Sequence, residues 1–248
     1  MNLFEIENIW IFLVILPIVA FMYAAVGHGG ASGYLAMMAL FGFLPETMKP
    51  TALLLNLFVA AISFIHYAKT GHFNKKLFIV FAVASIPLAF LGGSIEIDAS
   101  LYKKVLAVLL VFAILRMLNV FGKENIEIKE VKIWEGLTVG GVIGFFSGLI
   151  GIGGGIILSP VILLMKWGKM KETAAVSALF IWVNSAAGMG GQLSNGLKID
   201  PQAFILVGIA VVGGFLGGYL GSKKMNNKVL RYMLAFVLAS ACVKLFIT

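Results

Sequence analysis

Residues Gly144–Pro160 read GFFSGLIGIGGGIILSP, an apolar run that four glycines interrupt within the five positions from Gly151 to Gly155. The apolar stretch that follows, 156–166, is little more than half of the roughly 20 residues that a helix needs to cross a bilayer core at about 1.5 Å per residue. The stretch therefore predicts a broken or re-entrant hairpin, which enters the membrane, turns on the glycines and leaves by the same face. Backbone that is not helical is tolerated at that depth only inside protein or beside a water-filled cavity.

The first half of the chain carries the same pattern. Gly27–Ala31, with the sequence GHGGA, also precedes a short apolar stretch, 33–44, and begins 124 positions before Gly151. The tripeptide Lys-Val-Leu recurs at the same offset, at Lys104 and again at Lys228. A register held over this length predicts two structural repeats. The predicted domains are a first transmembrane repeat over 1–121, a charged cytoplasmic linker over 122–135 and a second transmembrane repeat over 136–248.

The composition places the protein in a membrane. Of its 248 residues, 60% are hydrophobic and 12% are charged, and the mean hydropathy is +1.02. A soluble domain carries about 25% charged residues because it needs a wet surface. The net charge of +8 comes from lysines in short loops, as membrane topology favours, so no nucleic-acid partner is expected. Glu5 and Glu7 stand where a signal peptide carries positive charge, so the first apolar segment is expected to stay in the mature protein.

The apolar stretches of each half predict a broken or re-entrant hairpin followed by three transmembrane helices. The odd number of crossings after each hairpin inserts the two halves in opposite orientations, which is the inverted-repeat architecture of secondary transporters. The predicted fold is all-α, a polytopic transmembrane helical bundle of two inverted repeats. The stretches run over about 9–26, 33–44, 50–68, 77–95 and 100–118 in the first half, and over about 136–150, 156–166, 172–191, 201–222 and 228–247 in the second.

Charge placement predicts the orientation of this bundle. With the acidic N-terminus outside, Lys75, Lys76, the central linker and Lys166–Lys171 fall inside, and both chain termini fall outside. Lys103 and Lys104 depart from the rule, because they lie near the outer end of their predicted helix. The expected location is the cell (inner) membrane, crossed many times.

Function is expected at the two glycine clusters. A helix that restarts there points unpaired N–H groups and the positive end of its dipole into the protein, where an anion can bind. The alternative is close packing of helices through small residues. Packing is the preferred interpretation for two other glycine groups, Gly92-Gly93 and Gly213–Gly221.

Polar side chains inside the apolar segments complete the candidate site, because such groups are costly in lipid and usually face a cavity or another helix. Asn56 follows the first hairpin and Asn184 follows the second, and each carboxamide could bind an oxyanion or bridge two helices. His28 could bind an anion, carry a proton or make a structural hydrogen bond. The predicted substrate-binding residues are Gly27, His28, Gly29, Gly30, Thr51, Asn56, Gly153, Gly154, Gly155, Ser177 and Asn184.

Several activities lack their motifs in this sequence. There is no G-x-x-x-x-G-K-[ST] phosphate loop for ATP-driven pumping, and no H-E-x-x-H or Cys/His cluster for a metal. Ser147 and Ser159 stand near glycines, but no dyad partner for a serine protease is evident. No enzyme activity, cofactor or metal is therefore expected. The expected partners are a small anion and the lipid bilayer, and assembly into a homo-oligomer is left open.

The pattern resembles the sulfite exporter TauE/SafE family of bacterial and archaeal membrane permeases. The resemblance is carried by GxxSGLIGIGGGIILSP at Gly144–Pro160, by AAVSALFIWVNSAAG at Ala174–Gly188, and by a diverged first-half version over Gly27–Asn56. The first-half motif departs from the family pattern at His28 and Ala31.

The resemblance implies transport of small sulfur-containing anions such as sulfite, thiosulfate or organosulfonates, for example sulfoacetate, in export or in uptake. Paired glycine clusters in discontinuous helices favour alternating access around the hairpin tips as the mechanism. The alternative is a channel-like anion pore, or a structural membrane subunit that requires a partner.

Overall fold

The computed structural model describes residues 6–96 and 128–226, together with residues 228, 229, 232, 233 and 236. The predicted segment 100–118, most of the predicted segment 228–247 and the linker residues 122–127 lie outside the described residues.

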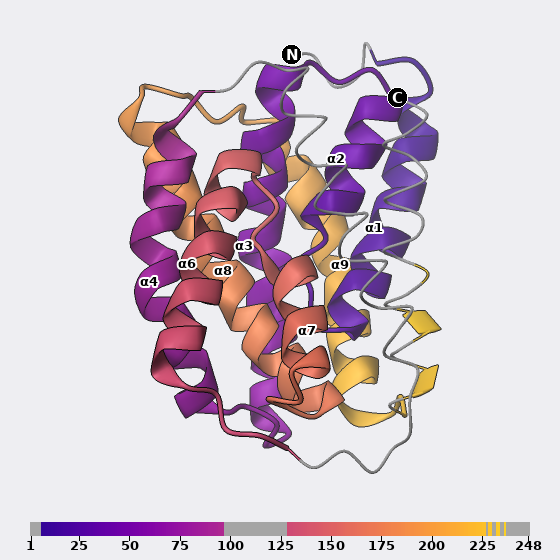
Figure 1. Cartoon of the computed structure of the whole chain (residues 1–248). Coiled ribbons are helices and arrows are strands. Elements are labelled where there is room, and N and C mark those ends of the chain that lie inside the picture. The colour runs from indigo at the N-terminus through magenta and orange to yellow at the C-terminus, as the bar shows by residue number, and fades with distance from the viewer. Residues whose placement is uncertain (1–5, 97–127, 227, 230–231, 234–235, 237–248) are drawn as a thin grey trace.

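Regular structure in the described residues is helical throughout, and the helices form one bundle (Figure 1). Five of these helices, α3, α4, α6, α8 and α9, are long and apolar enough to cross a membrane. The described chain is therefore an all-helical, multi-pass bundle, as predicted. The bounds are α1 (Ile9–Ala25), α2 (Ala31–Leu40), α3 (Pro45–Lys69), α4 (Lys75–Ser94), α6 (Ile133–Ile150), α7 (Gly155–Leu164), α8 (Met170–Ser194) and α9 (Ala203–Lys223).

Each glycine cluster ends one helix and starts a short one. The first cluster separates α1 from α2, and the second separates α6 from α7. Both α2 and α7 have ten residues, too few to span a bilayer core. A positive φ strains any residue that carries a Cβ, so glycine is what allows the chain to leave the helix at these points. The glycines with positive φ are Gly27 (80°), Gly30 (103°), Gly151 (84°), Gly153 (74°) and Gly154 (77°).

Two helices begin earlier than the apolar stretches predict, because their first turns are polar. α3 begins at Pro45 rather than at residue 50, with a proline in its first turn and Glu46 near the positive end of its dipole. α8 begins at Met170, and Glu172 accepts a hydrogen bond from the Lys169 amide at 3.2 Å. Hydropathy does not detect such turns, since the side chains that cap a helix are polar.

The central pair of helices is α3 and α8, which pack against each other. α4 packs on α6 and α8, and α9 packs on α1 and α3, so each pairing in one half of the chain has a counterpart in the other. In Figure 1, α2 lies in the upper part of the bundle and α7 in the lower part. Two related halves would produce these exchanged pairings; their opposite insertion in a membrane remains a prediction.

Two rows of glycines allow helices from different halves to approach closely. A Cβ on Gly140, Gly144 or Gly148 of α6 would overlap backbone carbonyl oxygens of α4. A Cβ on Gly213, Gly217 or Gly221 of α9 would overlap those of α1. Within each row the glycines are four residues apart, so they share one helix face. The packing interpretation of Gly213–Gly221 is therefore confirmed, and a Cβ on Gly92 or Gly93 would likewise meet backbone atoms of Phe145 or Gly188.

Gly217→Ala is expected to destabilise the bundle by about 1–3 kcal/mol, because the added methyl group meets the carbonyl of Phe21, which cannot move without shifting α1. Gly208→Ala on the same helix is the matched control, since nothing lies within 4 Å of its added Cβ. The control should gain about 0.5–1 kcal/mol from helix propensity. Thermal unfolding in detergent, followed by circular dichroism, measures both. Equal melting temperatures for the two variants would contradict the packing role.

Candidate functional site

His28 joins the first helix break to the second. Its Nε2 lies 3.1 Å from the carbonyl oxygen of Gly155 and 2.8 Å from Oγ of Ser159. Ser159 in turn donates to Oγ of Ser177 at 2.7 Å. A carbonyl oxygen can only accept, so Nε2 carries the proton. These contacts tie the break between α1 and α2 to α7 and α8, and the three side chains are buried.

Asn56, in α3, bonds to both halves of the chain. Its Oδ1 accepts from the Ala31 amide at 3.0 Å and so caps the first turn of α2, while its Nδ2 donates to Oγ of Ser185 in α8 at 3.2 Å. A Cβ on Gly29 or on Gly153 would collide with the Asn56 carboxamide. Asn56 therefore has the interhelical role that the sequence left open, and substrate contact by Asn56 remains a prediction. We call the region where Asn56 and His28 connect the two breaks the junction.

Seven buried polar atoms have no hydrogen-bond partner among the described residues; three of them belong to Thr173 and Gln192 of α8, and the other four lie around the junction. An unpaired buried polar group costs about 1–3 kcal/mol, so such atoms mark places where a ligand, an ion or a water molecule binds. The four atoms around the junction are Nδ1 of His28, the hydroxyl of Tyr34, Oγ of Ser147 and Oδ1 of Asn184.

The glycines connect these atoms to the two breaks. A Cβ on Gly30 would meet the Tyr34 ring, and one on Gly154 would touch Phe180 and Ser147. Asn184 lies one turn beyond Phe180 in α8 and donates through Nδ2 to the Phe180 carbonyl at 2.8 Å. Hydroxyls therefore flank both clusters, one from each half of the chain.

The side chains that line the junction are neutral and offer hydrogen-bond donors, while the partly buried Lys49 of α3 lies against Gly151 beside the second break. No carboxylate, lysine or arginine is among the buried polar residues of the described chain. The Tyr34 and Ser147 hydroxyls can donate, and α2 and α7 both begin at the junction with the positive ends of their dipoles. Nδ1 of His28 accepts while the ring is neutral and would become a donor on protonation. Helix N-termini and hydroxyl donors of this kind can bind an anion.

Most of the predicted site residues lie at the junction, and three differ from the rest. Gly27 packs against the backbone of Ala174, and Gly30 lies against the Tyr34 ring, so both have a clear packing role. Thr51 is buried in α3, but the hydrogen bonds of the junction do not involve it. The residues that line the junction are His28, Gly29, Asn56, Gly153, Gly154, Gly155, Ser177 and Asn184.

Sequence reasoning missed Tyr34, Ser147, Ser159 and Ser185 as site residues. Ser147 and Ser159 stand within the glycine-rich stretch itself, and Ser185 shares a helix face with Ser177 and Ile181, four residues apart each time, so those serines could have been found. Tyr34 carries no such signal, because an aromatic residue in a short apolar helix is equally typical of a core.

Several membrane-spanning helices around a buried, neutral junction of two helix breaks define a polytopic membrane protein of the transporter type. The comparison with known proteins agrees with this class: the chain belongs to the sulfite exporter TauE/SafE family, whose profile matches residues 11–245.

Two relatives come from a bacterium and an archaeon. A protein of Sinorhizobium fredii, described as a probable membrane transporter protein, is 41% identical over 182 residues, which cover 72% of this chain and 74% of the relative. A protein of Methanocaldococcus jannaschii with the same description is 29% identical over 195 residues, which cover 72% of each chain. No solved structure matches the chain. The protein is therefore a multi-pass membrane transporter.

His28→Gln is expected to keep the stability of the wild type, because the glutamine amide can place a donor where Nε2 lies. His28→Asn places its amide nearer to the position of Nδ1 and leaves the Gly155 carbonyl without its donor, so it should lose about 1–3 kcal/mol. Thermal unfolding of the purified variants in detergent measures the difference. A stable asparagine variant beside an unstable glutamine variant would show that the Nδ1 side of the ring, not the Nε2 side, holds the two breaks together.

Proposed function

We propose that the protein is a secondary transporter, acting as a permease or exporter, of small sulfur-containing anions such as sulfite, thiosulfate or organosulfonates, sulfoacetate among them. The description of the family as sulfite exporters supports this class of substrate. The observation that carries the proposal is the junction, where two helix N-termini and buried hydroxyls without partners meet, while no carboxylate, lysine or arginine is fully buried among the described residues. A sulfur oxyanion presents several acceptor oxygens, which need donors of this kind.

The proposed mechanism is alternating access around the junction. The hydrogen bonds of His28 to Gly155 and Ser159, and that of Asn56 to Ser185, run between the two halves. A rocking motion of one half against the other would break and remake these bonds while α2 and α7 keep their own helical hydrogen bonds. Discontinuous helices at the interface of two repeats are the usual setting for such motion in secondary transporters.

The proposed orientation rests on one end of the bundle, called the basic end, where α3 and α9 end and α4 and α8 begin. Contacts assemble this end: Lys171 donates to the Ser222 carbonyl at 3.0 Å, and Lys76 lies 3.5 Å from Glu130. The lysines there are Lys69, Lys75, Lys76, Lys129, Lys132, Lys166, Lys169, Lys171, Lys223 and Lys224. The opposite end carries Glu7, Glu46, Glu96 and Asp200 with Lys49 and Lys198. By the positive-inside rule, the basic end faces the cytoplasm from the inner membrane.

Tyr34→Phe, Ser147→Ala and Asn184→Ala are each expected to lower sulfite flux about tenfold or more, because a hydrogen bond to a charged group contributes about 1.5–3 kcal/mol. Uptake of radiolabelled sulfite into proteoliposomes, with internal sulfite for counter-transport, measures the effect. Ser85→Ala is the matched control, since this buried serine of α4 bonds to the Ala82 carbonyl of its own helix at 3.3 Å.

Wild-type flux in all three folded variants would reject the junction as the substrate site. A wild-type protein that moves none of sulfite, thiosulfate and sulfoacetate would reject the substrate class. Flux that does not saturate and shows no counter-transport would indicate a pore instead of a carrier.

A further inference from the structure

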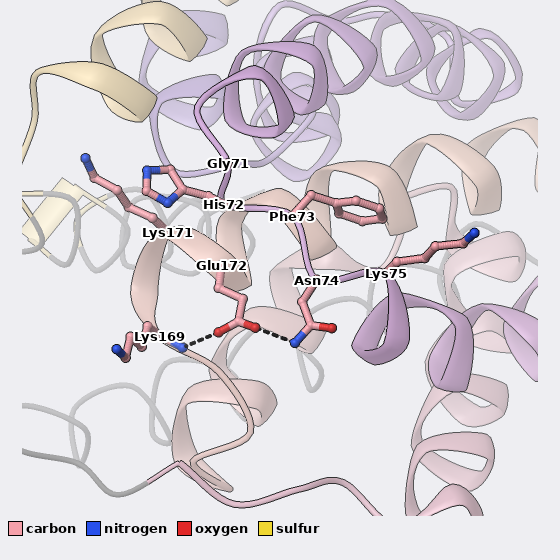
Figure 2. A pocket seen from close by; sticks show the side chains of 8 residues that line it. All are labelled: Gly71, His72, Phe73, Asn74, Lys75, Lys169, Lys171 and Glu172. Carbon is pink, nitrogen blue, oxygen red and sulfur yellow. Dashed lines mark hydrogen bonds between the residues drawn. The ribbon is translucent and has the colours of Figure 1, made fainter.

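A cavity of about 570 Å³ opens at the basic end, between the loop that joins α3 to α4 and the first turn of α8 (Figure 2). Its volume lies within the range of about 300–1,000 Å³ that is usual for small-molecule sites. The loop and the helix turn come from different halves of the chain. The lining residues are Gly71, His72, Phe73, Asn74, Lys75, Lys169, Lys171 and Glu172.

The one carboxylate that lines this cavity is already bound on both oxygens. Oε1 of Glu172 accepts from Nδ2 of Asn74 at 2.5 Å, and Oε2 accepts from the Lys169 amide at 3.2 Å. Glu172 therefore connects the loop to the start of α8 through hydrogen bonds to both of its carboxylate oxygens (Figure 2). It does not pair with a lysine side chain in the described residues.

The basic side chains of the cavity keep donors for another partner. His72 and Lys171 lie together on one side, and Lys169 projects from the same side of α8 (Figure 2). Lys171 uses one donor on the Ser222 carbonyl, and an ammonium group has three. Burial and the positive charge of Lys171 lower the pKa of His72, as expected of a group in a positive field. By contrast, the neighbouring Lys76 stands outside the cavity, paired with Glu130.

A small apolar cluster contacts both this cavity and the first helix break. Tyr67, Ala174 and Ala175 form it and are called the Tyr67 layer; Phe73 of the cavity packs against it, and Gly27 lies against the backbone of Ala174. The Tyr67 hydroxyl donates to the Ala25 carbonyl at the end of α1. Along α8, Glu172 in the cavity wall and Ser177 at the junction are five residues apart, about 8 Å along the helix axis.

We infer that this cavity is a binding site for a free oxyanion, a vestibule where the transported sulfite or sulfonate binds at the basic end before or after it crosses the Tyr67 layer. The inference rests on the proposed function for its role and on the lysines and His72 for its chemistry. Sulfite, sulfonates, sulfate and inorganic phosphate share the acceptor oxygens that these donors recognise. The lysines stay in water-accessible positions at the mouth, where positive charge concentrates anions without the cost of burial.

Binding can be measured without transport by nuclear magnetic resonance of the histidines. The protein has three histidines, so the spectrum contains few signals to assign. Protein labelled with ¹³C-histidine, in a neutral detergent, is titrated with sodium sulfite and with sodium sulfate, and the His72 signal is assigned with His72→Gln. The signal should shift saturably. Lys169→Gln and the double variant Lys169→Gln, Lys171→Gln should raise the half-saturation concentration about threefold and about tenfold, as loss of local steering charge predicts.

Lys76→Gln and Lys198→Gln are the matched controls, one beside the cavity and one at the opposite end, and both should behave as the wild type. No saturable shift, or one half-saturation concentration for all variants, would overturn the inference. Lys169→Gln keeps the backbone amide that holds Glu172, so it tests the charge even if the double variant does not fold.

Two further measurements, of sulfite flux and of lipid binding, distinguish a failure of this inference from a failure of the proposed function. In proteoliposomes, the double variant should have a higher half-saturation concentration for sulfite supplied at the basic end than the wild type has, with the same maximal rate. This difference between variant and wild type should vanish near 1 M salt, where the Debye length is about 3 Å. Saturable binding without flux would reject the transport function and leave an anion site. Sulfite flux without saturable binding at His72, and without any effect of the lysine variants on that flux, would reject the vestibule and leave the transport function standing. The same His72 signal is also recorded in nanodiscs of phosphatidylglycerol and of phosphatidylcholine. If only phosphatidylglycerol shifts the signal, and sulfite then causes no further shift, the cavity is a lipid headgroup site and the vestibule is overturned.

Discussion

A helix that stops inside a membrane exposes N–H and C=O groups that lipid cannot satisfy, and the rest of this structure depends on that constraint. The two breaks of this chain are bonded to each other and to the central helices. The Gly155 carbonyl of the second break receives the proton of His28 in the first. The Ala31 amide of the first break is bonded to Asn56 of α3, which also donates to Ser185 of α8. These bonds place both breaks in the interior, beside α3 and α8.

Close packing around the junction follows from the same constraint. Lipid provides no hydrophobic drive for helices to associate, so contact area and small side chains have to hold them together. Gly140, Gly144 and Gly148 bring α6 against α4, and the corresponding row on α9 brings it against α1. Each row joins the two halves, so the same contacts that stabilise the bundle also form the surface on which one half would move against the other.

Charge and polarity are divided between the interior and the basic end. The junction uses neutral hydroxyls, an amide and helix N-termini, because a buried full charge would be costly and would hold an anion too tightly to release it. The lysines stand at the ends of the helices, where water shields them, and those of the cavity beside His72 attract anions toward the junction. The Tyr67 layer between the two regions keeps the electrostatics of the mouth apart from the hydrogen bonds of the interior.

The sequence by itself determined the membrane environment, the all-helical class and the positions of both helix breaks, since hydropathy and the need for glycine at positive φ are local properties. It also singled out His28, Asn56 and Ser177, because polar groups in apolar segments are costly wherever they point. The tertiary structure alone decided their partners: Asn56 meets Ser185, 129 residues away, and His28 meets Gly155, 127 residues away. It alone decided that Tyr34 and Ser147 have no hydrogen-bond partner among the described residues, and that Lys169 and Lys171 line a cavity with His72. The physical reason is that a hydrogen bond or a cavity depends on which groups long-range packing brings together, and no local pattern of residues records that.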